Sequence, residues 1–358
     1  MNFTAVIETT ENCNLNCSFC LRPSFKKRCM SLTVLEKVIA HLLEFSEERV
    51  DFIWHGGEPL LAGLDFFKKI LIFQKKYNKK GGIIRNNIQT NGTILSKRFI
   101  DFFEKENFDI GTSIQGTKEI HDFVRKDKIG NPTYDKILLN ISKLKNKPSS
   151  IIVLTKDILG KEKEIYNEIK SLVYGIRISE YFPGKASGKM SESEMPEFQM
   201  PTPEEYGKSM LKFYDVWKKD SNPIEIKPIT EMIRAFVRGE SNSCLYSQKA
   251  CNYSIIGIKS NGDFFTCLRG ANNKNFFLGN IIEKPLKKRK KLSEYFIKKR
   301  IKNLLDNNCK GCEFWNQCNG GCPQESIKLY GDIKHKTIYC EGRKMLLKEI
   351  LKDLKGVK

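Results

Sequence analysis

The first half of the chain alternates between short apolar segments typical of strands and longer segments with apolar residues at helical spacing. Six strand-then-helix units follow one another, and each strand ends in a polar or glycine-containing loop. Such alternation predicts an α/β fold with a parallel sheet, closed or partly closed as a barrel, with the chemistry at the carboxyl ends of the strands. The expected strands are 4–9, 50–54, 83–89, 108–114, 151–155 and 175–180, and the expected helices are 31–45, 64–77, 96–106, 134–144 and 161–172.

The alternation stops at residues 184–203, a stretch rich in Ser, Gly, Glu, Met and Pro that is the best linker candidate. An Asn-Gly pair at 261–262 then indicates a hairpin turn. Most of the remaining sequence is rich in cysteine and poor in regular pattern. The elements expected beyond the linker are helices at 203–219 and 229–239, a hairpin at 253–265 and an amphipathic helix at 342–354.

The chain carries 62 Lys and Arg against 42 Asp and Glu, a net charge of +20. Such a charge is evidence about partners rather than about fold. The densest basic run, residues 284–291, lacks the interleaved aromatic side chains of a platform for single-stranded nucleic acid. A solvated face, or a docking surface for an acidic peptide, is therefore favoured over a nucleic-acid groove.

No apolar run approaches the roughly 18 residues that a membrane span needs, and no signal peptide is recognisable at the start. We therefore expect a cytoplasmic protein. In that reducing compartment the twelve cysteines have little use as disulfides, so they are expected to be metal ligands.

Three cysteines follow the first expected strand at short intervals: Cys13, Cys17 and Cys20. Thiolates at this spacing can hold an iron–sulfur cube. Three ligands for four irons leave one iron open, as a catalytic cluster requires. A zinc knuckle is the alternative interpretation of the three cysteines.

With these cysteines the chain resembles the radical S-adenosylmethionine (SAM) superfamily. The resemblance implies that SAM chelates the open iron and is cleaved to a 5′-deoxyadenosyl radical, which abstracts hydrogen from a substrate. Residues 54–60, WHGGEPL, resemble the GGEP motif of that family, whose main chain receives the SAM ammonium group. The SAM-binding residues implied by the resemblance are Phe19, Gly57, Glu58, Ser113 and Arg125.

The C-terminal cysteines resemble the SPASM extension of radical SAM peptide maturases, which binds two further 4Fe–4S clusters. Spacing alone does not decide which thiols share a cluster. On family precedent the resemblance implies three 4Fe–4S clusters in all, and it leaves Cys29 as a free thiol near the active-site mouth or, as the alternative, in a substrate-linked or regulatory role. The implied auxiliary ligands are Cys244, Cys251, Cys267 and Cys322 for the first cluster, and Cys309, Cys312, Cys318 and Cys340 for the second.

The expected organisation is a radical SAM partial (β/α)6 barrel at 1–200, a helical linker at 201–240 and a SPASM domain at 241–358. The resemblance is strongest to the anaerobic sulfatase-maturating enzymes, which convert a Cys or Ser of a sulfatase to formylglycine. It extends nearly from end to end, through GGEPLLAGLDFF, QTNGT, HDFVRKD and LGNI.

Two positions depart from that family. Its members carry an Asp base directly after the hairpin cysteine, where this chain has Leu268 followed by Arg269. Neither side chain accepts a proton at neutral pH, so no catalytic residue is assigned. The family's SLDG also becomes SIQG, with Gln115 in place of a carboxylate.

Without that base we expect a thioether, a cyclophane or a similar modification of a ribosomally made peptide, with formylglycine formation as the alternative. Arg22 and Arg269 are expected to contact the substrate, which is a peptide or protein and could carry an acidic leader. An external electron donor of the flavodoxin or ferredoxin type is a further expected partner. A zinc-stabilised nucleic-acid-binding protein is the alternative from a different class.

Overall fold

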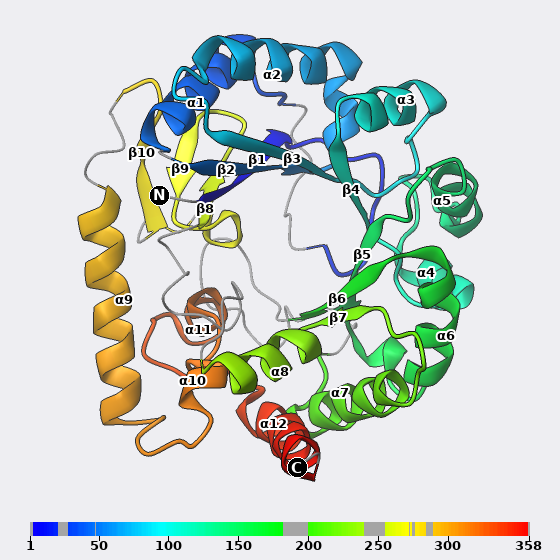
Figure 1. Cartoon of the computed structure of the whole chain (residues 1–358), viewed down its shortest axis with the longest axis vertical. Helices are drawn as coiled ribbons and strands as arrows, with labels where there is room; N and C mark the ends of the chain where they lie inside the picture. Colours follow the sequence, from blue (N-terminus) through cyan, green and yellow to red (C-terminus); the bar gives the residue numbers. More distant parts are fainter. Residues whose placement is uncertain are drawn as a thin grey trace.

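A computed structural model describes residues 3–20, 28–46, 48–181, 200–239, 255–271, 273, 276–283 and 289–356. Its strands form one ten-stranded sheet in the order β10-β9-β8-β1-β2-β3-β4-β5-β6-β7. Helices cover the outer side of this strongly curved sheet (Figure 1). Neighbouring strands from β1 to β6 are parallel and consecutive in sequence, which confirms the predicted strand-then-helix barrel.

The barrel elements match the sequence prediction closely, with ends that differ by a few residues. The short α4 was not predicted, because its seven residues give too little periodicity. The bounds are β1 Phe3–Thr10, α1 Leu32–Phe45, β2 Arg49–Gly56, α2 Leu64–Tyr77, β3 Ile83–Gln89, α3 Lys97–Lys105, β4 Phe108–Thr112, α4 Lys118–Val124, α5 Tyr134–Ile141, β5 Ser149–Leu154, α6 Glu162–Leu172 and β6 Gly175–Glu180, with 3-10 turns η1 Pro59–Ala62 and η2 Lys156–Ile158.

The C-terminal half contains two elements to which the sequence prediction gave no bounds. The short strand β7 lies between the two expected helices and extends the sheet beside β6. The helix α9 begins within the basic run and presents Ile297, Arg300 and Leu304 on one buried face. Its many lysines hide this apolar stripe in the sequence. The bounds are α7 Pro203–Lys218, β7 Glu225–Lys227, α8 Ile229–Arg238, β8 Ile255–Ile258, β9 Asp263–Phe265, η4 Leu268–Gly270, β10 Phe277–Asn280, α9 Arg289–Asp306, α10 Trp315–Cys318, α11 Pro323–Tyr330 and α12 Cys340–Gly356.

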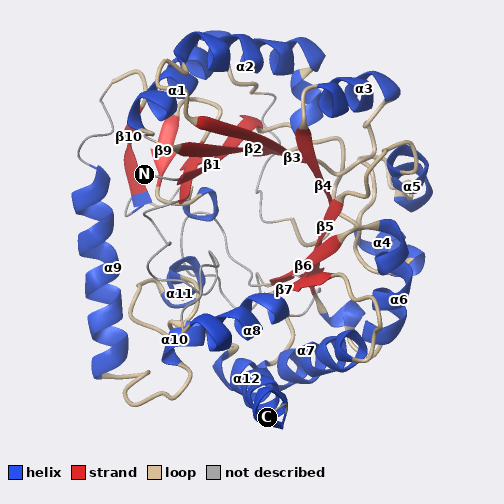
Figure 2. Cartoon of the chain, in the orientation of Figure 1, coloured by secondary structure: helices blue, strands red, loops and turns tan. Residues whose placement is uncertain are grey.

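The predicted hairpin joins the C-terminal half to the barrel sheet. Strands β8 and β9 pair antiparallel, with Gly262 at a φ of 86° in the turn, where a glycine is free of the Cβ clash. Strand β8 pairs parallel with β1, so one sheet continues across the predicted domain boundaries (Figure 2). The predicted boundaries themselves remain a prediction, and the proposed linker at 184–203 lies largely outside the described residues.

The apolar core lies between the sheet and the helices, because alternate strand residues face opposite sides. In β1, Phe3, Ala5 and Ile7 pack with the residues of α1 and α2, while Glu8 belongs to the opposite, inner face. At the other end of the sheet α12 packs against α7, where a Cβ at Gly342 would lie 2.1 Å from the carbonyl oxygen of Pro203. Glycine therefore permits this close helix approach. No helix in the described parts of the chain is long and apolar enough to cross a membrane.

Candidate functional site

The three N-terminal cysteines lie in a loop that leaves the carboxyl end of β1 and docks on the segment after α4. The backbone N–H of Asn16 donates to the carbonyl of Lys126 at 2.8 Å, and that of Ser18 donates to Val124 at 3.0 Å. An isolated bridge pairs Leu15 with Asp127. The loop is thus held over the ends of the strands, as predicted for chemistry in a parallel barrel.

The thiols of this loop lie close enough to affect one another electrostatically. Burial raises the pKa of Cys13 to about 11, against the 3.4 Å hydrogen bond from the Leu15 N–H, and the neighbouring Cys17 and Cys20 raise it further. Burial also raises the pKa of Cys17, while Arg125 lowers it. Clustered thiols of this kind, two of them partly buried, suit a metal group, whose positive charge favours the thiolates that burial disfavours.

Two of the predicted SAM-binding residues meet beside Cys17. The Arg125 guanidinium lies 4.9 Å from the centre of the Phe19 ring, and its Nη1 is 3.8 Å from the Cys17 sulfur. Its Nε is buried and makes no hydrogen bond within the described part of the chain. A buried donor of this kind, next to the thiols, fits the carboxylate of a ligand such as SAM.

The Gly56-Gly57 pair is packed against the cysteine loop. The N–H groups of Gly57 and Glu58 donate to the carbonyls of Thr10 and Asn12 at 2.9 and 2.8 Å. A Cβ at Gly57 would lie only 2.1 Å from the Asn12 carbonyl oxygen. The structure therefore gives a second reason for glycine here, namely the close approach of the loop that carries the cysteines.

The Glu58 side chain is completely buried and ties two loops together. Its carboxylate accepts hydrogen bonds from the Thr90 hydroxyl and the Asn91 N–H, both at 2.7 Å, and from the Leu60 N–H at 3.1 Å. Burial nevertheless raises the pKa of Glu58 to about 7. The carboxylate thus fixes the loop after β3 against the GGEP segment.

Ser113 follows β4 and accepts a hydrogen bond from Gln89 Nε2 at 3.3 Å. Gln115, which replaces the family carboxylate, is fully buried and bonds twice to the backbone of Val153. Its amide donates to the Val153 carbonyl at 2.5 Å and accepts from the Val153 N–H at 3.0 Å. The side chain therefore acts as a strand partner for β5 at the point where β4 ends.

Four C-terminal thiols line a single pocket, and they are the four that were predicted to share the second auxiliary cluster: Cys309, Cys312, Cys318 and Cys340. Burial raises the pKa of Cys309 to about 11, and the three other thiols raise it further. Within the described ranges, no three Cys, His, Asp or Glu side chains converge closely enough to hold a single metal ion.

The first auxiliary set is only partly described. Burial, and then Cys322, raise the pKa of Cys267, so these two thiols lie near each other. Arg269 and Lys328 lie beside them, and burial followed by the Arg269 charge lowers the pKa of Lys328 to about 8. The predicted ligands Cys244 and Cys251, and the predicted substrate contact Arg22, lie outside the described residues.

The unassigned Cys29 is exposed and sits beside the end of β1, where it forms a bridge with Thr10. Its sulfur lies 3.3 Å from the Thr10 hydroxyl, and Thr10 is three residues before Cys13. This position agrees with a thiol near the mouth of the predicted site.

Residues 7–169 match the family described as the Radical SAM superfamily. This match contains the cysteine loop, the GGEP segment and the Arg125 segment whose geometry is given above. Residues 7–169 form a radical SAM domain. Membership implies a 4Fe–4S cluster and SAM as cofactors, and the clustered thiols and the buried Arg125 donor fit both.

Relatives of this radical SAM enzyme match along nearly its whole length. The cysteine-type anaerobic sulfatase-maturating enzyme of Clostridium novyi is 26% identical, over 96% of this chain and 94% of that protein. The serine-type enzyme of Bacteroides thetaiotaomicron is 29% identical, over 92% of this chain and 84% of that protein.

Solved structures give the same picture. Native anSMEcpe with bound AdoMet and Kp18Cys peptide has a TM-score of 0.86 and 25% identity, and covers 100% of this chain and 99% of that chain. Streptococcus suis SuiB bound to its precursor peptide SuiA has a TM-score of 0.66 and 19% identity, and covers 95% of this chain and 76% of that one. The predicted fold class, a partial radical SAM barrel with a C-terminal SPASM domain, is confirmed.

Sequence reasoning missed the residue that connects the two thiol regions of this radical SAM enzyme. Arg343 of α12 is fully buried and donates to both carboxylate oxygens of Glu180, at 2.9 and 2.6 Å, at the end of β6. Its Nη1 also lies 3.5 Å from the Cys318 sulfur. Next to Glu180, Tyr181 packs with Phe19, beside Cys17. No sequence signal links positions so far apart, because single Glu and Arg residues carry no pattern.

Proposed function

We propose that this enzyme is a sulfatase-type maturase, which oxidises a Cys or Ser side chain of a protein or peptide to formylglycine. Support comes from whole-length similarity to anaerobic sulfatase-maturating enzymes in sequence and in fold. SuiB, solved with the precursor peptide SuiA, is similar in fold alone, with a lower TM-score and less of its own chain covered. The comparisons thus favour the alternative raised by the sequence over the thioether or cyclophane modification expected first.

In this proposal Cys13, Cys17 and Cys20 hold the cluster that binds SAM. When bound, the cluster and SAM supply a 5′-deoxyadenosyl radical that abstracts a hydrogen atom from the substrate. Arg125 would pair with the SAM carboxylate, and Ser113 would contact its ribose. The main chain of Phe19 would contact the adenine, and the main chain around Gly57 and Glu58 would receive the ammonium group.

Two auxiliary clusters complete the proposed set of three. Cys309, Cys312, Cys318 and Cys340 would hold one, and their shared pocket supports this grouping. Cys267 and Cys322, which lie near each other, would hold the other together with Cys244 and Cys251. Buried thiols with raised pKa values release protons when iron binds, so cluster assembly would also stabilise the C-terminal half.

The proposed substrate is a peptide segment, which Arg22 and Arg269 would contact; Arg269 lies beside Cys267 and Cys322 of the first auxiliary set. The net charge of +20 favours acidic partners. An external flavodoxin- or ferredoxin-type donor in the cytoplasm would reduce the SAM cluster.

The test uses full-length enzyme reconstituted with iron and sulfide under anaerobic conditions. It receives a reductant, SAM and a matched pair of sulfatase-derived peptides that differ only in a Cys or a Ser at the target position. Trapping with a hydrazine, followed by mass spectrometry, detects an aldehyde in the peptide. Cleavage of SAM without aldehyde in either peptide would contradict the proposal.

A further inference from the structure

The proposed oxidation needs a proton acceptor, and this inference rests on the proposed function. Converting a –CH2–XH group, where X is oxygen or sulfur, to –CH=X removes two hydrogens. One leaves carbon as a hydrogen atom and forms 5′-deoxyadenosine. The other leaves X as a proton, and the remaining electron passes to an iron–sulfur cluster; when X is sulfur, water then replaces it and hydrogen sulfide leaves. Leu268 and Arg269 cannot take that proton at neutral pH.

Leu268 lies on the inner face of the sheet. Ile256 and Ile258 of β8 pack on the outer face, so the side-chain position of Gly257 between them is on the inner face. A Cβ at Gly257 would lie 2.2 Å from the Leu268 nitrogen. The Leu268 main chain therefore occupies the inner side of β8 at Gly257. In the parallel ladder Gly257 is the register partner of Val6 of β1.

Glu8 is the next inner-face residue of β1 beyond Val6, toward the carboxyl end. It therefore lies one strand away from the Leu268 position, and five residues before Cys13 of the cluster loop. On the other neighbouring strand, β2, the register partner of Glu8 is His55. Glu8 thus brings a carboxylate to the strand ends where the radical chemistry is proposed to occur.

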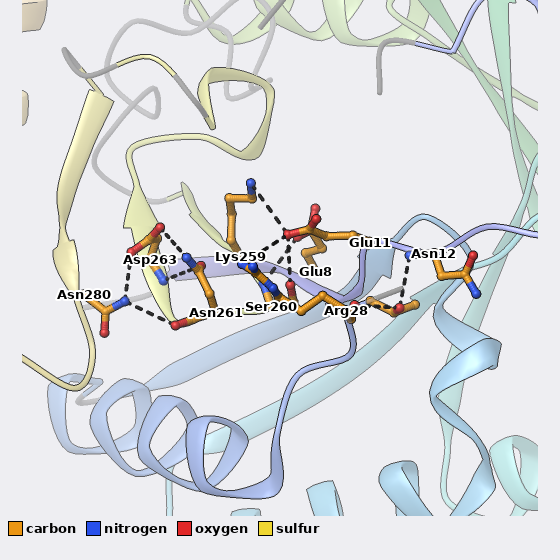
Figure 3. Close-up of polar contacts among 10 residues, drawn as sticks. Glu8, Glu11, Asn12, Arg28, Lys259, Ser260, Asn261, Asp263 and Asn280 are labelled. Carbon is orange, nitrogen blue, oxygen red and sulfur yellow. Dashed lines mark hydrogen bonds and ion pairs between the residues drawn. The ribbon is translucent and has the colours of Figure 1, made fainter. Parts of the chain in front are cut away.

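Hydrogen bonds hold this carboxylate in place. Glu8 is 4% exposed and accepts from the Ser260 N–H at 3.3 Å. In Figure 3 its side chain lies beside that of Glu11, next to Lys259 and Ser260 of the hairpin. Glu11 lies 3.9 Å from the Lys259 ammonium and 3.9 Å from the Arg28 guanidinium, so these cations brace Glu11 between the cysteine loop and the hairpin.

Other carboxylates on the described barrel strands are placed less favourably. Asp51 and Asp109 lie toward the amino ends of β2 and β4, away from the cysteine loop. Glu180 belongs to the outer face of β6 and is fully engaged by Arg343. We propose that Glu8 accepts the proton from the substrate thiol or hydroxyl, in place of a residue at position 268.

The test compares Glu8→Gln, Leu268→Asp and the double variant in the peptide assay. A Gln at position 8 still accepts the Ser260 hydrogen bond but takes up no proton. We expect E8Q to form aldehyde at least about 100-fold more slowly, while peptide-dependent 5′-deoxyadenosine formation continues. In the double variant, L268D should restore at least about a tenth of the wild-type rate, since it supplies a carboxylate one strand away. The control is Asp109→Asn, which also replaces an inner-face carboxylate by an amide but at the amino end of β4. It should leave the rate of aldehyde formation unchanged.

Each outcome decides the inference. Wild-type aldehyde formation by E8Q would overturn it and leave the proposed function standing. Loss of both SAM cleavage and aldehyde in E8Q, without rescue by L268D, would show a structural role for Glu8 and also overturn it. Failure of the wild-type enzyme to form any aldehyde would instead overturn the proposed function, and this inference with it.

Discussion

At the residue scale, the amide of Gln115 performs a task that a carboxylate cannot. It donates to the carbonyl and accepts from the N–H of the same residue, Val153. The sequence suggested only the loss of a carboxylate near the SAM site. The structure gives a positive reason for the amide, because a carboxylate has no proton to donate.

Replacing Gln115 by Glu should therefore destabilise the protein by about 1–3 kcal/mol, since a buried carboxylate would face the Val153 carbonyl without a proton between them. The measurement is the urea unfolding midpoint under anaerobic conditions. The control is the reverse exchange at an exposed position of α4, Glu119→Gln, which should leave the unfolding midpoint unchanged. Equal midpoints for Q115E and the wild type would contradict this account.

A second buried side chain near the SAM site predicts a pH dependence. His121 accepts from the Gln115 N–H at 3.1 Å and lies 3.2 Å from the Thr133 hydroxyl. Burial, and then the Arg125 charge, lower the pKa of His121 to about 3. The unfolded chain therefore binds this proton more readily than the folded one, and stability falls as the pH drops below about 6.5.

Between about pH 7.5 and pH 5, this difference should cost the wild type about 2 kcal/mol of unfolding free energy. His121→Asn lacks the titrating group, so its stability should change by that much less over the same interval. Urea titrations at the two pH values measure the difference. Parallel losses in both proteins would show that His121 does not titrate as described.

At the element scale, α12 connects the C-terminal thiol pocket to the barrel. Arg343 on this helix binds Glu180 at the end of β6 and also reaches Cys318. Arg300 on α9 is a natural comparison, because it is equally buried but donates to backbone carbonyls, those of His335 and Gly320 among them. Arg343 thus adds a contact with a proposed cluster ligand, Cys318, to its pairing with Glu180.

Arg343→Met should destabilise the fold by about 3–5 kcal/mol, because it leaves the Glu180 carboxylate buried without its partner. Combining it with Glu180→Met should recover most of that loss. The reduction potential of the cluster in this pocket should be lower than in the wild type in both the single and the double variant. Both variants lose the Arg343 hydrogen bond to a cluster ligand, and such hydrogen bonds help to set the potential.

The potential is measured by redox titration followed by electron paramagnetic resonance, in protein whose Cys13, Cys17 and Cys20 are replaced by Ala. Arg300→Lys is the control and should leave the potential unchanged. If the reduction potential shifts from the wild-type value as much in R300K as in the R343M/E180M double variant, the cause is a general loss of packing and not the lost contact with Cys318.

At the scale of the whole molecule, the sequence predicted the repeating strand-then-helix units and drew attention to the closely spaced cysteines. Strands β1 to β6 have strong periodicity, and the four C-terminal thiols that family precedent assigns to one cluster line one pocket. Strand β7 is three residues long and becomes a strand only through its pairing with β6. The Glu180–Arg343 pair joins residues 163 positions apart, and only the folded chain brings them together.

The central claim is that this chain oxidises a Cys or Ser side chain with a SAM-derived radical. The most direct measurement counts 5′-deoxyadenosine and peptide aldehyde in the same anaerobic reaction of the wild-type enzyme with matched Cys and Ser peptides. The account predicts that both products form together, in nearly equal amounts, with at least one of the two peptides. Formation of 5′-deoxyadenosine with no aldehyde from either peptide, and of a crosslinked product from a short co-expressed precursor, would contradict it.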